Sequence, residues 1–207
     1  MAQKPSNSAK KTRLIVGISG ASGVAIGIRL LEAISELGLE SHLVVSRAGE
    51  MTIGYETALK PKQVLAKADF AYGITDIAAP IASGSFKTAA MIVAPCSIKT
   101  MSEIATGVTT SLLTRAADVT LKERRPLILM VRESPLHLGH LRSLVQLAEM
   151  GAIILPPAPA FYAEPKSISD LVDQFVGRAL DLLGYDWPDV KRWGEDLSKG
   201  RRSKQSR

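Results

Sequence analysis

The stretch Arg13-Leu-Ile-Val-Gly-Ile-Ser-Gly-Ala-Ser-Gly23 decides the fold of this chain of 207 residues. Its apolar run at 14–18 predicts a buried β-strand. The glycines at 17, 20 and 23 predict a tight turn, and the apolar residues that follow at helical spacing predict a helix over 23–37. Such a turn exposes backbone N–H groups and a helix N-terminus, which together attract a phosphate group. The motif alone does not select one ligand, because it recurs in many folds.

Strand and helix patterns alternate along the rest of the chain. Strands are predicted at 14–18, 42–45, 90–94, 126–131 and 152–155, with Pro95 ending the third and Pro156-Pro157 closing the fifth. Helices are predicted at 23–37, over most of 47–68 with a break near Lys60-Pro61, within 97–123, at 138–150 and at 168–183, whereas 69–88 is ambiguous. This alternation predicts a single α/β domain with a mainly parallel sheet covered on both faces. Ligands of such sheets bind beyond the carboxyl ends of the strands.

The positive charge of the chain is concentrated at its two ends. Of the formal net charge of +6, residues 1–12 contribute +3 and residues 196–207 contribute +4, so that 13–195 carries −1. We expect two basic disordered tails around one folded domain at 13–195, and no nucleic-acid partner. The lone Cys96 excludes an internal disulfide, and no apolar run is long enough to span a membrane. These features predict a cytoplasmic protein without a membrane partner.

The glycine spacing argues against a dinucleotide site. The dinucleotide fingerprint is G-x-G-x-x-G, with an acidic residue at the end of the second strand. Here the second strand ends in Ser46-Arg47. A mononucleotide such as FMN needs only a phosphate site and polar groups for its tail and ring, so the fold allows FMN without selecting it.

Polar side chains follow several predicted strands, where a ligand would bind. Ser22 lies in the first turn, Ser97 follows the third strand, and Arg132-Glu133 follows the fourth. Each has a purely structural alternative: Ser97 can cap a helix, and Arg132-Glu133 can be a surface ion pair. Tyr162 follows the stiff proline segment and could equally be an aromatic residue at the edge of the core.

Three further cations have open alternatives. Arg178 shares a predicted helix face with apolar residues, so it either extends its charge to solvent or meets an anionic ligand. Arg115 and Lys122 are two helical turns apart, on a face that is either solvated or reaches a neighbouring subunit's site. The run 122–125 is typical of a solvated helix end. His137 and His140 lack a third ligand of suitable spacing, so no metal site is expected.

Taken together, the motifs resemble the flavin prenyltransferase family, formerly labelled phenylacrylic acid or 3-octaprenyl-4-hydroxybenzoate decarboxylases. The resemblance spans residues 13–195. It is carried by the first glycine turn, Ser83-Gly-Ser85, Pro95-Cys-Ser-Ile-Lys-Thr100, Arg115-Ala-Ala-Asp118, Leu121-Lys-Glu-Arg-Arg-Pro-Leu127, Arg132-Glu133, Pro156-Pro-Ala-Pro-Ala-Phe-Tyr162 and Arg192-Trp193.

The resemblance implies a flavodoxin-like, three-layer subunit of a homododecamer with sites built between subunits. It implies a metal-independent transfer of the dimethylallyl group from dimethylallyl phosphate to N5 and C6 of reduced FMN. The prenylated FMN would serve a downstream aromatic-acid decarboxylase, in ubiquinone biosynthesis or in the breakdown of phenolic acids. The residues that would contact FMN are Gly20, Ala21, Ser22, Ser46, Ser97, Lys99, Thr100 and Arg132. Those that would surround the dimethylallyl phosphate are Ser22, Arg115, Lys122, Glu133, Tyr162 and Arg178, with Trp193 closing the site.

The residue types suit this chemistry. The three cations Arg115, Lys122 and Arg178 can neutralise the charge that grows on the departing phosphate, a task that Mg²⁺ performs elsewhere. Glu133 could donate a proton to the phosphate, and Glu56, near the reacting edge of the flavin, could take the proton lost from C6. We expect Ser22, Glu56, Lys122 and Glu133 to be the catalytic residues. The rings of Tyr162 and Trp193 offer π faces to a cationic allyl fragment.

Two rival functions remain open at this point. An FMN-dependent cysteine decarboxylase typically carries Pro-Ala-Ser-Ala-Asn-Thr and Pro-x-Met-Asn segments. This chain has Pro95-Cys-Ser-Ile-Lys-Thr100 in place of the first and lacks the second. A non-catalytic FMN carrier, or accessory subunit of a decarboxylase, would bind the flavin without releasing phosphate.

Overall fold

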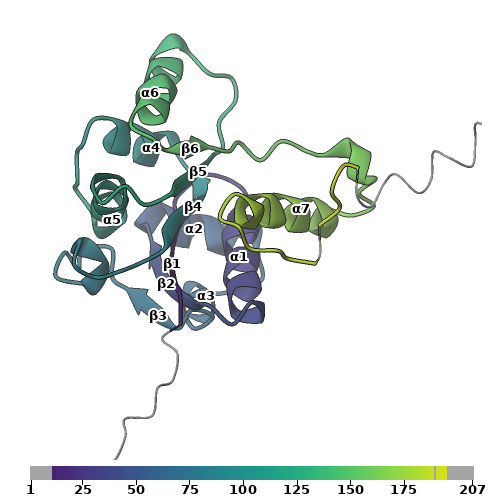
Figure 1. Ribbon diagram of the computed structural model, residues 1–207, viewed down its shortest axis with the longest axis horizontal. Coiled ribbons are helices and arrows are strands. Elements are labelled where there is room, and N and C mark those ends of the chain that lie inside the picture. The colour runs from purple at the N-terminus through teal and green to yellow at the C-terminus, as the bar shows by residue number, and fades with distance from the viewer. Residues whose placement is uncertain (1–10, 189, 195–207) are drawn as a thin grey trace, which may run out of the picture.

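The computed structural model describes residues 11–188 and 190–194, and its six strands form one parallel sheet in the order β3-β2-β1-β4-β5-β6 (Figure 1). The strands are β1 (Arg13–Ile18), β2 (Glu40–Val45), β3 (Phe70–Tyr72), β4 (Ala90–Cys96), β5 (Leu127–Val131) and β6 (Ile153–Ile154). The α-helices are α1 (Val24–Glu36), α2 (Arg47–Glu56), α3 (Pro61–Leu65), α4 (Ile98–Ala105), α5 (Leu112–Lys122), α6 (Leu138–Glu149) and α7 (Ile168–Asp181). Two short 3₁₀ helices are η1 (Pro80–Ala82) and η2 (Phe161–Ala163). The predicted three-layer α/β fold is confirmed.

Two segments differ from the prediction. The ambiguous region 69–88 contributes a short edge strand, β3, and the 3₁₀ helix η1. The strand β4 does not end at Pro95 but continues to Cys96, because its pairing with β5 shifts register between Val93 and Cys96. A proline is tolerated at such an irregularity, where its missing N–H removes no ladder bond. The tails predicted at 1–12 and 196–207 lie outside the described residues, apart from 11 and 12.

Alternating side chains of the strands supply two hydrophobic cores, one on each face of the sheet. In β1, Leu14, Val16 and Ile18 belong to the core that also holds the buried faces of α1 and α7. Ile15 of the same strand belongs to the other core, with residues of α4, α5 and α6. Helices α5 and α7 therefore cover opposite faces of the sheet (Figure 1). None of the helices within the described residues is long and apolar enough to cross a membrane.

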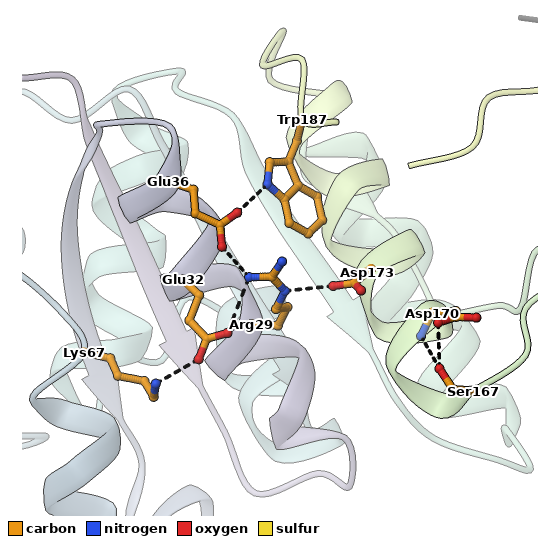
Figure 2. Close-up of polar contacts among 8 residues, drawn as sticks. All are labelled: Arg29, Glu32, Glu36, Lys67, Ser167, Asp170, Asp173 and Trp187. Carbon is orange, nitrogen blue, oxygen red and sulfur yellow. Dashed lines mark hydrogen bonds and ion pairs between the residues drawn. The ribbon is translucent and has the colours of Figure 1, made fainter. Parts of the chain in front are cut away.

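A charged network holds α7 against α1 (Figure 2). The guanidinium of Arg29 on α1 lies 2.8 Å from Oδ1 of Asp173 on α7 and 2.6 Å from Oε1 of Glu36. The indole N–H of Trp187 donates to the other oxygen of Glu36 at 2.9 Å, and the Arg29 guanidinium also lies over the Trp187 ring. The N-terminus of α7 is capped by Ser167, whose hydroxyl accepts from the Asp170 N–H at 3.1 Å. These contacts fix α7, the helix that carries Arg178.

A second polar network surrounds the buried His42, whose ring packs edge to face against Phe86 in the loop that precedes β4. The imidazole of His42 on β2 lies 2.8 Å from the hydroxyl of Tyr72 and 2.9 Å from a carboxylate oxygen of Glu40. Glu40 also accepts from Arg13 at 2.6 Å. Burial lowers the pKa of His42 below its ordinary value, although Glu40 partly opposes the shift. The imidazole is therefore held in its neutral form.

This network makes the stability of the protein depend on pH. The His42 imidazole of the unfolded chain takes up a proton near its ordinary pKa of about 6.5, whereas that of the folded chain does so only at lower pH. Stability should therefore fall as the pH drops below about 6.5, until the folded-state pKa is reached. Urea unfolding at several pH values measures the slope, and His42→Gln should flatten it. An unchanged slope in His42→Gln would assign the pH dependence to other groups.

Candidate active site

A cavity of about 510 Å³ opens beyond the carboxyl ends of β1, β2 and β4, where the sequence predicted a ligand. Its wall is formed by five separate segments of the chain, which are loops and helix starts. The lining residues are Gly20, Ser46, Arg47, Ala48, Ile74, Thr75, Ser97, Lys99, Thr100, Glu103, Thr110, Ser111 and Leu113. Five of the predicted FMN contacts, Gly20, Ser46, Ser97, Lys99 and Thr100, thus share one cavity.

Three helices begin at this cavity, each capped by a serine. The hydroxyl of Ser46 accepts from the Gly49 N–H at 3.0 Å at the start of α2. Ser97 and Ser111 cap α4 and α5 in the same way. Helix N-termini carry partial positive charge and present unpaired N–H groups, so their convergence favours an anion. The donor set fits the phosphate of FMN, and the cavity leaves room for part of a mononucleotide.

The first glycine turn differs from the prediction. The N–H groups of Gly23 and Val24, at the start of α1, donate to Oε2 of Glu56 at 2.8 and 3.2 Å. The carboxylate of Glu56 therefore occupies the place where the motif predicted a phosphate. Two N–H groups at the start of α1 therefore already donate to a carboxylate of the protein itself. The three helix N-termini capped by serines form the better phosphate site.

The contacts of Glu56 also set its charge. Burial acts to raise the pKa of Glu56, but hydrogen bonds from Ser22 and from the Gly23 and Val24 N–H groups, together with the charge of Arg132, lower it below the ordinary value. Glu56 is therefore ionised at neutral pH and can accept a proton. Arg132 follows β5, and its backbone N–H donates to the Cys96 carbonyl at 3.1 Å. This contact ties the end of β5 to the end of β4.

Ser19 is a structural residue of the site that the sequence analysis missed. Its side chain is buried, and its hydroxyl donates to the Pro95 carbonyl at 2.8 Å and accepts from the Ser97 N–H at 2.7 Å. The first turn is thereby joined to the start of α4. Its place inside the glycine turn was visible in the sequence, but its partners are 76 and 78 residues away. Ser111 was also missed, although its spacing from Thr114 matches a capping motif.

Removing the Ser19 hydroxyl should loosen the site. In Ser19→Ala the Ser97 N–H and the Pro95 carbonyl lose a buried partner, which costs about 1–3 kcal/mol of stability. We expect a lower urea midpoint and weaker FMN binding, measured by flavin fluorescence. The variant Ser35→Ala, on an exposed stretch of α1, is the control and should change neither. Unchanged FMN affinity in Ser19→Ala would show that the turn holds its shape without this hydroxyl.

Tyr162, Arg178 and Trp193 form a second cluster. Tyr162 and Arg178 line two small cavities, of about 190 and 270 Å³, and Trp193 joins them in the larger one. The Tyr162 and Trp193 rings meet edge to face with centroids 5.4 Å apart. Arg178, in the last turn of α7, is exposed, so its charge extends to solvent in one chain, which is one of the two alternatives left open by its helix face. Among the described residues it forms no ion pair.

Arg115 and Lys122 form a third group, on α5. The Arg115 guanidinium donates to the Ala82 carbonyl at 3.2 Å and pairs with Asp118 at 2.8 Å. Lys122 pairs with Glu123 at 2.5 Å. Neither cation lines a cavity with Tyr162 or Arg178, since α5 and α7 cover opposite faces of the sheet. Within the described part of one chain, the cations predicted to bind the phosphate therefore lie in two separate places, Arg115 and Lys122 on α5 and Arg178 on α7.

The remaining predicted residues have separate surroundings. Lys99 pairs with Glu103 on the next turn of α4 at 2.7 Å. Glu133 is exposed at the end of β5, where its carboxylate accepts from the Ser134 N–H at 2.9 Å. Ala21 is buried in the first turn. No cluster of three or more potential metal ligands of the His, Cys, Asp or Glu type occurs within the described residues.

Known proteins resemble this chain over most of its length. The Flavoprotein family model matches residues 2–180. The flavin prenyltransferase UbiX of Escherichia coli strain K12 is 53% identical over 184 residues, covering 87% of this chain and 97% of the relative. The crystal structure of dodecameric FMN-dependent UbiX-like decarboxylase from Escherichia coli O157:H7 superimposes with a TM-score of 0.86 at 45% identity, covering 88% of this chain and 99% of the other.

This chain is also similar to a protein whose crystal structure contains bound ligands. The crystal structure of AnUbiX (PadA1) in complex with FMN and dimethylallyl pyrophosphate has a TM-score of 0.88 at 48% identity, covering 89% of this chain and 98% of that one. The cysteine decarboxylase TvaF, by contrast, shares only the fold, with a TM-score of 0.58 at 17% identity. The predicted fold and family are thereby confirmed, and the chain belongs to the flavin prenyltransferase family represented by UbiX.

Proposed function

We propose that this protein transfers a dimethylallyl group from dimethylallyl phosphate to reduced FMN, without a metal ion. The observation that carries the proposal is the similarity, over 89% of the chain, to a structure that holds FMN and dimethylallyl pyrophosphate. The cavity with three helix N-termini supports it, because this cavity suits the phosphate of FMN. Reduced FMN supplies two nucleophilic atoms, N5 and C6, which receive the two ends of the allyl unit.

The protein's own residues would act mainly on the phosphate ester. Its allylic C–O bond breaks, the electron pair leaves with the phosphate, and Arg115, Lys122 and Arg178 neutralise the added charge. Glu133 would donate a proton to the departing phosphate. The bond to N5 is followed by a C–C bond between C6 and the far carbon of the allyl unit, for which the C=C bond opens and its middle carbon takes up the proton that Glu133 gave to the phosphate. The ionised carboxylate of Glu56 would accept the proton released from C6.

Aromatic and polar residues would orient the reactants. The Tyr162 and Trp193 rings, already in edge-to-face contact, would shield the allyl fragment from water and stabilise its positive charge. Ser22 lies beside Glu56 and would help to hold its carboxylate towards the flavin. Ser46, Ser97 and Thr100 would hold the FMN phosphate, with Gly20, Ala21, Lys99 and Arg132 completing the FMN site.

We further propose that the protein works as a homo-oligomer, as the dodecameric relative does. A neighbouring subunit would bring Arg115 and Lys122 to the Tyr162–Arg178 cluster, which one chain does not do. Exposed apolar surface supports this assembly. Such surface lies along α6, at Leu138, Leu141 and Val145, and around η2, at Phe161 and Ile168.

The product would leave for another enzyme. We propose that a downstream aromatic-acid decarboxylase takes up the prenylated FMN, in ubiquinone biosynthesis or in phenolic-acid breakdown. A cytoplasmic location is proposed as well. It is supported by the single cysteine, whose thiol is buried and has its pKa raised to about 12 by desolvation, which is unsuited to disulfide exchange.

Anaerobic incubation with reduced FMN and dimethylallyl phosphate tests the proposal. The extracted flavin should gain the mass of one C5H8 unit, and inorganic phosphate should appear in equal amount. Adding a chelator should change neither yield. Bound flavin of unchanged mass would instead identify a non-catalytic FMN carrier, and oxidative loss of CO₂ from a peptide with a terminal cysteine would identify a cysteine decarboxylase.

A further inference from the structure

The loop at 82–88 is held in place by basic side chains from α5 and the residues that follow it. The Arg125 guanidinium donates to the Gly84 carbonyl at 2.7 Å, to the Phe86 carbonyl at 3.0 Å and to the Thr88 hydroxyl at 3.3 Å. Arg115 adds its bond to the Ala82 carbonyl. The Ser83-Gly-Ser85 motif lies in this loop, and the roles proposed above leave it unassigned.

The run 122–125 was predicted to be a solvated helix end, but Arg125 does not fit that prediction. Its side chain is 16% exposed, whereas that of Lys122 is 46% exposed. All three of its hydrogen-bond acceptors belong to the same short loop, which a planar guanidinium can hold at several points at once. The loop position is therefore set by one enclosed side chain.

Gly84, in this loop, lies close to the side chain of Lys122. A Cβ atom added to Gly84 would lie 2.8 Å from Nζ of Lys122, and closer still to Oε1 of Glu123. The backbone at Gly84 is thus packed directly against the ion pair of Lys122 and Glu123. Glu123 in turn faces Arg125 at 3.9 Å. Moving the loop would move the surface against which the Lys122 ammonium group rests.

We infer that Arg125 is a positioning residue for the transfer reaction, because it holds Gly84 against the Lys122–Glu123 pair and so fixes the Lys122 ammonium group. The inference rests on the proposed function, in which Lys122 neutralises the departing phosphate. The guanidinium contacts given above join Arg125 to the loop and to Glu123. Its effect passes through the loop and appears only in steps that use Lys122.

A double-mutant cycle tests the coupling. In the full-length protein, Arg125→Met should lower kcat/KM for dimethylallyl phosphate about tenfold, mainly by raising KM. The affinity for FMN should stay within about twofold of that of the unchanged protein. In a Lys122→Ala background the same Arg125→Met change should cost less than about twofold, because its target is gone. Single-turnover measurement of prenylated flavin extends the cycle to slow variants.

Gly84→Ala reaches the same ion pair without touching Arg125. Its new methyl group should displace the flexible ends of Lys122 and Glu123 at little cost to the fold. We expect a KM increase like that of Arg125→Met and an unchanged urea midpoint. Gly73→Ala is the matched control, since a Cβ there meets no atom within 4 Å. It should leave both quantities unchanged.

The outcomes separate this inference from the proposed function. If the unchanged protein forms no prenylated flavin, the proposed function is wrong. If it does, but Arg125→Met costs the same tenfold with and without Lys122, Arg125 acts independently and the positioning role is overturned. Normal KM in Gly84→Ala would overturn it as well. The positioning role is supported if Arg125→Met and Gly84→Ala each lower kcat/KM for dimethylallyl phosphate, and if this effect disappears in the Lys122→Ala background.

Discussion

Arg178→Met is expected to lower kcat/KM for dimethylallyl phosphate about 100- to 1,000-fold. Arg178 forms no ion pair within the described residues, and it lines two cavities together with Tyr162. A cation left unpaired beside an aromatic ring is available to a phosphate ester. Methionine keeps much of the length of the side chain but cannot neutralise charge that develops as the C–O bond breaks.

The loss should be confined to the phosphate substrate. Arg178 does not line the 510 Å³ cavity, so the affinity for FMN should be unchanged. Initial rates of phosphate release at several substrate concentrations, with FMN titrations beside them, measure both quantities. Lys62→Met on α3 removes an exposed charge that lines none of these cavities and is the control. Activity of Arg178→Met within about twofold of that of the unchanged protein would place the ester phosphate elsewhere.

Sequence patterns were sufficient for the fold because its signals are local. The apolar runs of β1, β4 and β5 alternate with helices whose apolar spacing is clear, and a parallel sheet follows from that order. The region of β3 stayed ambiguous, because this short edge strand has exposed side chains at its first two residues. The prediction failed at Pro95, where the register shift that admits a proline depends on the neighbouring strand β5.

The site was predictable as a set of residues but not as an arrangement. Ser46 and Ser97 follow strands, so their place at one cavity was expected from the parallel sheet. The contact between Glu56 and the start of α1 could not be expected, because it joins residues 32 and 33 positions apart through tertiary packing. The separation of Arg115 from Arg178 likewise depends on which face of the sheet each helix covers.

The largest effect on folding is expected at Gly27, where α1 meets the sheet. A Cβ added to Gly27 would lie 2.2 Å from the carbonyl oxygen of Ala94 and 2.8 Å from Cγ1 of Ile18. The first of these is a backbone atom of the central strand β4, so it cannot move aside as a flexible side chain could. Gly27→Ala should therefore destabilise the protein by about 3 kcal/mol, although alanine favours a helix more than glycine does.

The loss should be visible both in stability and in flavin binding. A thermal scan should show a melting temperature lower by roughly 10 °C. Ala94 precedes Pro95, whose carbonyl accepts the Ser19 hydroxyl, so a displaced β4 also disturbs the FMN cavity. Gly54→Ala on α2 is the matched control, because a Cβ there meets no atom within 4 Å. It should stabilise the protein by about 0.5–1 kcal/mol. Equal melting temperatures for Gly27→Ala and the unchanged protein would mean that α1 does not approach β4 as closely as these distances require.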